Sequence, residues 1–203
     1  MEEYNIKKNS PAYSPKDVRD LFELAVKKED GSIEAVLSNK HKYKSLLELW
    51  HASFLAVAIN KWQRKKFYLT IPDQQPPDVL FIDENAGEAF QVEVMELFDY
   101  GQTYFDGDHE RLAKKVIQTK GLFCMPQCHL LLINRINSDT FNISKFSREL
   151  KKCTWNFERI WLSLYTASNL SWSFFEVFPS NANNKTLSIS VSIKNPDDMH
   201  YFY

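Results

Sequence analysis

Two acidic residues, Asp78 and Glu93, are the side chains of this sequence best placed for metal chemistry. Asp78 begins the apolar run DVLFID, Glu93 lies within the run AFQVEV, and a polar turn with Gly87 joins the runs. This pattern predicts two adjacent strands, and the face opposite Glu93 is apolar. A carboxylate in mid-strand is costly to bury unless it is paired or binds a cation, and its oxygens suit Mg²⁺. If the strands are neighbours, Asp78 and Glu93 converge on a magnesium ion; the alternative is a solvated Glu93 facing a lysine.

Glu48 and Lys120 are two further candidates, and each lies on a predicted helix. Glu48 is in line with apolar positions of the helix expected over residues 45–65. It is either a rim residue of the first turn or a third acid of the metal site. Lys120 continues the apolar face of the helix expected over residues 108–120, whereas the two lysines before it point elsewhere. It is either a snorkelling residue at a helix end or a cation that serves the site.

The elements that position these side chains follow a regular order. From residue 45 to 134 the pattern predicts helix, strand, strand, strand, helix and strand, over residues 45–65, 67–71, 78–83, 89–94, 108–120 and 129–134. A helix that begins at Ser14-Pro15 precedes them. A basic helix over residues 144–152 and strands over 159–165, 174–178 and 187–193 follow. We expect one globular protein in which an N-terminal helical accessory region, residues 1–40, precedes an α/β domain, residues 41–203.

The acidic motif and this element order together resemble the PD-(D/E)xK nuclease superfamily. Pro77-Asp78 matches the PD element, and the segment EVM at 93–95 takes the place of (D/E)xK. Met95 departs from the family because it stands where the lysine belongs. In a second register, QVE at 91–93, an acid takes the lysine position but glutamine replaces the first acid. The resemblance implies a restriction-endonuclease-like αβββαβ core, with a mixed central sheet flanked by helices, and additions of helices before it and strands after it.

The resemblance also implies the chemistry, which is metal-dependent hydrolysis of phosphodiester bonds. Asp78 and Glu93 would hold Mg²⁺ or Mn²⁺ against the scissile phosphate, and Glu48 would assist through water. Lys120 is the candidate for the positive charge that is missing at Met95. The implied partner is nucleic acid, DNA in the first place; a homodimer is compatible with the family, and no membrane is involved.

Composition sets the outer limits of these interpretations. The chain has 203 residues, 44% of them apolar, which suits a folded domain with a sizeable core. Only five glycines are present, and no Gly-rich phosphate loop is found. The net charge of −1 gives no support for nucleic-acid binding by itself, although basic residues cluster locally, as at residues 64–66 and 151–152. Three cysteines without a framework, and no apolar leader, predict reduced thiols, no zinc site and a cytoplasmic protein.

Three functional hypotheses remain open at this point. The first is an active nuclease, and the second is a nuclease-like fold without catalysis that binds nucleic acid or protein, which the departure at Met95 and the balanced charge favour. The third is an unrelated α/β protein whose acids are surface residues. The loop expected over residues 98–107 carries Tyr100, Tyr104 and Phe105, which either stack on bases or cover the edge of the core.

Overall fold

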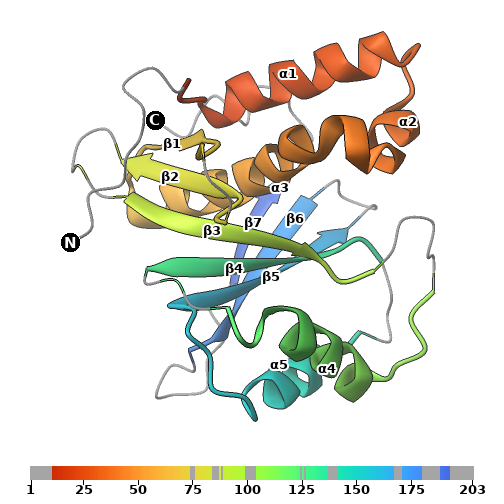
Figure 1. The fold of residues 1–203 in the computed structure, drawn as a ribbon, viewed down its shortest axis with the longest axis vertical. Coiled ribbons are helices and arrows are strands. Elements are labelled where there is room, and N and C mark those ends of the chain that lie inside the picture. The colour runs from red at the N-terminus through yellow and green to blue at the C-terminus, as the bar shows by residue number, and fades with distance from the viewer. Residues whose placement is uncertain are drawn as a thin grey trace. The chain divides into compact units, whose positions relative to one another are not determined.

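A computed structural model gives the fold (Figure 1). The chain forms two compact units, and the boundary between them in the sequence falls between Glu93 and Val94. The boundary lies inside a strand and not near residue 40. The structure describes residues 11–73, 76–83, 87, 89–98, 104–123, 125, 127–136, 141–166, 171–179 and 188–192. Tyr100, one of the three aromatic residues predicted to stack on bases or cover the core, and Cys124, one of the three cysteines, lie outside the described residues. Within them, no helix is both long enough and apolar enough to span a membrane.

The first unit consists of three helices followed by strands. Its elements are α1 (Pro15–Lys28), α2 (Ile33–Ser38), α3 (Lys40–Gln63), β1 (Phe67–Thr70), β2 (Val79–Asp83) and the first part of β3 (Ala89–Glu96). The predicted start of α1 is confirmed: Ser14 caps it in a reciprocal capping box with Asp17, and Pro15 is its first residue. The helix α3 begins before the predicted residue 45, because Asn39 caps it and the chain continues through a kink at Tyr43.

A shared hydrophobic cluster joins α1 and α2 to α3. Phe22 and Ala25 of α1, Val36 of α2 and Leu47 of α3 belong to it. The ring of Trp50 in α3 stacks on Phe22 with centroids 4.1 Å apart. Because burial of these apolar surfaces stabilises the helices mutually, α1 and α2 pack together with α3 within this unit.

The three strands of the first unit form an antiparallel meander. Val79 pairs with Val92 and Leu80 with Gln91 between β2 and β3, and Thr70 pairs with Leu80 between β1 and β2. Side chains opposite one another in an antiparallel pair share a face. One face therefore bears Thr70, Leu80 and Gln91, while Phe67, Phe81 and Phe90 gather on the other face.

The contact between Asn60 and Phe67 fixes the turn from α3 to β1. The Phe67 N–H donates to Asn60 Oδ1 at 2.9 Å, and both groups are buried. We expect Asn60→Ala to destabilise the protein by about 1–3 kcal/mol in urea unfolding, because a buried amide then loses its acceptor. The control is Ser53→Ala on the same helix. The Ser53 hydroxyl donates a hydrogen bond to the Trp50 carbonyl oxygen within that helix, so its loss leaves no backbone N–H without an acceptor. An equal loss in both variants would show that Asn60 acts through packing alone.

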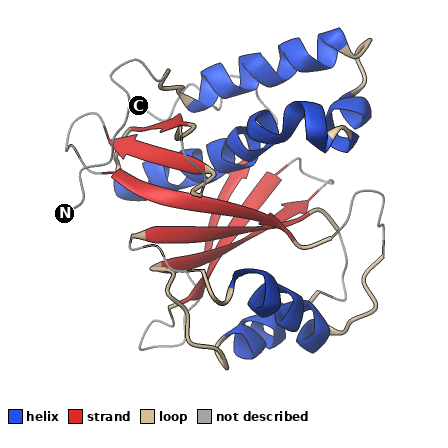
Figure 2. Ribbon diagram, in the orientation of Figure 1, coloured by secondary structure: helices blue, strands red, loops and turns tan. Residues whose placement is uncertain are grey.

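The second unit is a mixed sheet with two helices (Figure 2). After the end of β3 it contains α4 (His109–Lys120), β4 (Cys128–Asn134), α5 (Ile143–Leu150), β5 (Arg159–Thr166), β6 (Ser171–Phe178) and β7 (Ser188–Ser192). The strands β4 and β5 are parallel, whereas β5, β6 and β7 pair antiparallel in turn. One hydrophobic cluster includes Leu112 of α4, Phe146 of α5 and Leu130 of β4, so both helices bury an apolar face with the strands.

The observed elements confirm the predicted order at the coarse level. From α3 to β4 the chain runs helix, strand, strand, strand, helix and strand, and the later strands that the sequence predicts are present. The protein is therefore an α/β protein with a mixed sheet and flanking helices. A specific restriction-endonuclease-like core goes beyond this finding and stays a proposal.

Candidate metal and acid–base site

The structure brings Glu48 and Asp78 together in the first unit. Glu48 lies in the second turn of α3 after the kink, and Asp78 directly precedes β2. Both side chains are buried, with 9% and 6% of their residue surfaces exposed. Each carboxylate lies within the electrostatic reach of the other. Glu48, which the sequence placed on an apolar helix face, is thus directed at the predicted metal ligand and is not a solvated rim residue.

Asp78 and Glu93 occupy neighbouring strand positions. Since Val79 pairs with Val92, the residue before Val79 and the residue after Val92 adjoin across the two strands. Glu93 is 5% exposed, so the alternative of a solvated strand residue is wrong. Side chains at such positions share a face and lie within a few ångströms of one another at Cβ. The predicted pair therefore has the strand geometry that convergence requires.

Burial and charge together raise the pKa of Glu48. Desolvation is the larger cause, and the negative charge of Asp78 adds to it, bringing the pKa to about 7. Lys44 acts in the opposite direction, with Nζ 3.4 Å from Glu48 Oε1, but its own side chain is 59% exposed. Two buried acids that repel one another and are only partly compensated resemble the arrangements that enzymes use to tune carboxyl groups.

The carboxylates of Asp78 and Glu93, with Glu48 beside Asp78, fit a magnesium ion that is held by two protein carboxylates. Mg²⁺ is commonly bound by one or two protein carboxylates, with water and phosphate completing its octahedron. Glu48 Oε2 is buried and accepts no hydrogen bond from the described residues, so it retains a lone pair for a cation or its water. A complete protein cage is absent: the described part of the chain contains no group of three or more Asp, Glu, His or Cys side chains that could hold a metal.

Comparison of the chain with protein-family models, with curated proteins and with solved structures gives no match. The inference about function therefore depends on the residues themselves.

Removal of the Glu48 charge should stabilise the protein at neutral pH. A carboxyl whose pKa is raised on folding binds more protons in the folded state between pH 4.5 and 7, so the free energy of unfolding falls as pH rises through this window. Allowing for solvent screening, we expect Glu48→Gln to gain about 1–2 kcal/mol above pH 7 and to gain little below pH 4.5. Urea unfolding at several pH values measures this.

The control for that experiment is Glu34→Gln, which removes an exposed carboxylate from α2. It should leave the dependence of stability on pH unchanged. If Glu48→Gln destabilises the protein at pH 8, Glu48 is a stabilising partner of Lys44 and not a strained acid.

Met95 and Lys120 both belong to the second unit. Met95 is 8% exposed and is part of the hydrophobic cluster there, which gives the position an apolar structural role. Lys120 is the last residue of α4 and is half-buried, with Nζ 5.8 Å from the ring centroid of Phe123. This contact accords with a snorkelling lysine, and the role of Lys120 at the carboxylates stays a prediction.

The structure also shows where the predicted aromatic residues of the 98–107 loop and two of the cysteines lie. Phe105 is buried and packs edge-on against Phe98, so it covers the core, whereas Tyr104 is 70% exposed. Cys128 and Cys153 are free thiols in the second unit.

Sequence reasoning missed Arg111 of α4 and treated Lys115 only as half of a basic pair with Lys114 that could line a path for DNA. Arg111 pairs with Asp106 and lies 4.0 Å from Asp108, and Lys115 Nζ donates to the Leu97 carbonyl oxygen at 3.1 Å. The two are four residues apart and thus lie on one helix face, which is the signal that could have revealed them. Lys115, expected to point elsewhere than the apolar face, reaches from α4 to the chain that leaves β3.

Proposed function

We propose that this protein is a metal-dependent nuclease of the PD-(D/E)xK type, with Asp78 and Glu93 as metal ligands and Glu48 as an assisting acid. The observation that supports this best is the buried Glu48–Asp78 pair, in which burial and the neighbouring charge bring the pKa of Glu48 to about 7. Such a pair costs stability in the absence of a cation, and a divalent cation would remove the repulsion. Sites that bind and activate substrates are where such costs are retained.

Each side chain of the proposed site has a separate task. Asp78 and Glu93 present oxygens from adjoining strand positions. Glu48 can hold or release a proton near neutral pH, because a group with a pKa near the working pH exchanges protons most effectively. Bound Mg²⁺ would neutralise charge on the phosphate and lower the pKa of a water molecule.

Lys120 is the proposed source of the positive charge that the family places two residues after its second acid. Met95 takes that position here and has no charge. In this proposal the Lys120 ammonium orients the attacking water and stabilises the developing negative charge. Lys114, exposed on the same helix and paired with Glu110 at 2.7 Å, provides a matched control. Lys120→Ala should slow cleavage and Lys114→Ala should not.

A second candidate function is a nuclease-like module without catalysis. The burial of Met95 in a hydrophobic cluster favours it, because the strand position that would carry the lysine is committed to packing. In this case the protein binds nucleic acid or another protein, and its carboxylates do not take part in catalysis.

Cleavage assays separate the two functions. Labelled single-stranded DNA, duplex DNA and RNA are incubated with the protein in Mg²⁺, in Mn²⁺ and in EDTA. The nuclease proposal expects shortened products with either metal and none in EDTA. Binding without cleavage in every metal and substrate would instead support the inactive module.

A further inference from the structure

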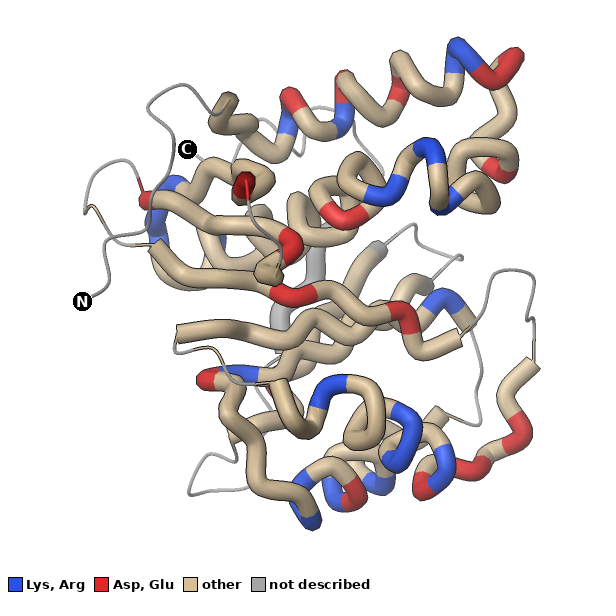
Figure 3. Tube along the Cα trace, viewed as in Figure 1, with Lys and Arg blue, Asp and Glu red and all other residues tan. Residues whose placement is uncertain are grey.

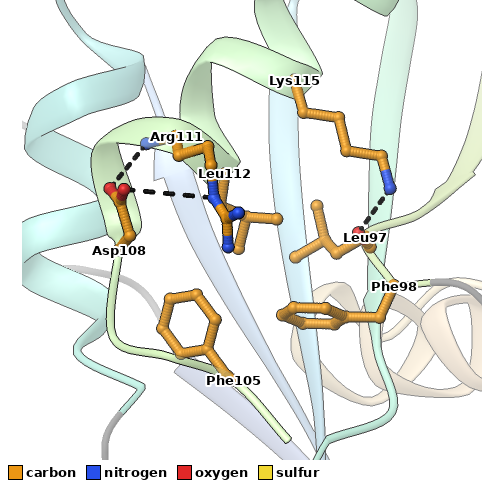
Figure 4. Close-up of a pocket in the computed structure, with 7 residues that line it drawn as sticks. All are labelled: Leu97, Phe98, Phe105, Asp108, Arg111, Leu112 and Lys115. Atoms are coloured by element: carbon orange, nitrogen blue, oxygen red, sulfur yellow. Dashed lines mark hydrogen bonds and ion pairs between the residues drawn. The ribbon is translucent and has the colours of Figure 1, made fainter. Parts of the chain in front are cut away.

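The second unit contains a cavity with an apolar floor and a charged rim (Figure 4). Its volume is about 270 Å³, and it is lined by Leu97, Phe98, Phe105, Asp108, Arg111, Leu112 and Lys115. The four apolar residues are buried and belong to the hydrophobic cluster. Sites for drug-sized ligands run from roughly 300 to 1,000 Å³, so this one suits a single planar ring system with a small substituent.

The aromatic part of the floor comes from Phe98 and Phe105. Their ring centroids are 5.6 Å apart with an interplanar angle of 66°. Aromatic rings gain from contact with the face or the edge of another ring, so a phenyl surface in the floor favours an inserted ring. Leu112 closes the floor from α4. The cavity thus favours a flat aromatic guest over a sugar or an ion.

The rim carries two cations that an anionic substituent can reach. Arg111 is 69% exposed, and Figure 4 shows its guanidinium over the apolar floor, joined to Asp108. Lys115 lies one helical turn further along α4 and donates to the Leu97 carbonyl oxygen. The bonds that Arg111 makes with Asp106 and Asp108 hold the guanidinium at the rim and leave some of its five N–H donors for an anion.

The neighbouring helix α5 adds positive charge. Residues 104–123, which contain α4, hold four Lys and Arg against three Asp and Glu, and residues 141–152, which contain α5, hold four against one, whereas the whole chain is nearly balanced. Figure 3 shows these positive residues along the two helices of the second unit. A local excess of positive charge attracts a polyanion by counterion release, and the negative total charge conceals it.

We propose that this cavity takes the base of an unpaired nucleotide, whose phosphate binds Arg111 and Lys115. The guest is then a nucleoside monophosphate unit, either free or within a single strand. A flat base fits the aromatic floor, and a phosphate fits two cations on one helix face. The choice of nucleic acid rests on the proposed function, and the inference extends that function by naming an unpaired substrate.

Fluorescence anisotropy with labelled oligothymidylate, in EDTA so that no strand is cut, tests the proposal. The informative variants are Arg111→Ala and Lys115→Ala. Their matched controls are Arg148→Ala, which is 71% exposed on α5, and Lys114→Ala, the immediate neighbour on α4. Each control removes the same type of side chain, but neither residue lines the cavity. Circular dichroism verifies the fold, and Arg111→Gln and Lys115→Gln replace any variant that unfolds.

We expect Arg111→Ala and Lys115→Ala each to weaken binding about tenfold, since each loses a charge-assisted hydrogen bond, and the controls to weaken it less than about twofold. Competition by thymidine monophosphate would identify the free nucleotide as sufficient, and competition by oligonucleotide alone would identify the strand. Equal losses in all four variants, equal affinity for duplex DNA, or equal competition by inorganic phosphate would overturn the proposal.

The binding assay tests the cavity assignment, and the cleavage assay tests the proposed nuclease, so either proposal can be wrong without the other. If the strand binds as expected but is never cut in Mg²⁺, the proposed nuclease is wrong and the cavity assignment stands. If the strand is cut at the same rate by the cavity variants and binds them equally, the cavity assignment is wrong and the nuclease stands.

Discussion

Asp78→Asn should abolish magnesium-dependent cleavage, with kcat/KM reduced at least about 100-fold, because a bound cation supplies several kcal/mol of transition-state stabilisation. The substitution keeps the size of the side chain and removes one charge. Asp78 is the common neighbour of Glu48, through their electrostatic interaction, and of Glu93, through the strand register. Loss of its charge should therefore affect the site more than loss of either glutamate alone.

The matched control is Asp83→Asn. Asp83 is the other aspartate of this strand region, is equally buried at 3% exposed, and lies 4.0 Å from Lys65. Asp83 comes an odd number of positions after Asp78 along the strand, so its side chain lies on the opposite face of the sheet. Asp83→Asn should retain cleavage when corrected for the folded fraction. Equal losses in both variants would indicate a general effect on folding.

The same variant has a second readout that does not depend on activity. Asp78 is one of the causes of the raised pKa of Glu48. Asp78→Asn should therefore lower that pKa and reduce the fall in stability between pH 4.5 and 7. This change would show that the variant is folded and that the two carboxylates interact.

His129 should make the free energy of unfolding fall strongly with pH in the acid range. It is buried in β4, where burial, with the nearby charge of Arg159 as a smaller cause, lowers its pKa to about 3. A histidine whose pKa is lowered on folding contributes its full stability above pH 6.5 and loses it as the pH falls toward 3, since the unfolded chain binds the proton more readily. The expected loss by pH 3 is of the order of 4 kcal/mol.

His129→Gln isolates this contribution. Glutamine keeps an acceptor near Trp161 Nε1, which lies 3.4 Å from His129 Nδ1, but does not titrate. The difference in unfolding free energy between wild type and variant should shrink as pH falls from 6.5 to 3. The control His41→Gln, at an exposed position of α3, should follow the wild-type profile. A constant difference across this range would contradict the assignment.

Local sequence signals predicted the elements well because each has a local physical cause. Ser14-Pro15 starts α1 through a capping box, and the alternation around Asp78 and Glu93 gives two paired strands. The unit boundary at Glu93 was not predictable, because it depends on which distant residues pack together. The packing of the predicted accessory region, residues 1–40, has the same kind of cause: Phe22 and Val36 bury against α3, and nothing in residues 1–40 alone reveals that contact.

The candidate site shows the same limit. The sequence placed Glu48 on an apolar helix face, but its contact with Asp78 depends on how α3 approaches β2. Met95 could be seen as a departure from the motif, whereas its burial in a hydrophobic cluster could not. The sequence showed Lys115 only as part of a basic pair with Lys114, and it gave Arg111 no role, because the cavity that both residues line depends on tertiary packing.

Calorimetric titration of Mg²⁺ into the wild-type protein and into Asp78→Asn, at pH 7 in two buffers of different ionisation enthalpy, tests the central claim most directly. If Asp78 and Glu93 hold a cation beside Glu48, the wild type binds Mg²⁺ and releases a fraction of a proton, because the cation lowers the pKa of Glu48 from about 7. Asp78→Asn should then lose both signals. The absence of binding to the wild type, or equal binding with no proton release in both proteins, would contradict the site.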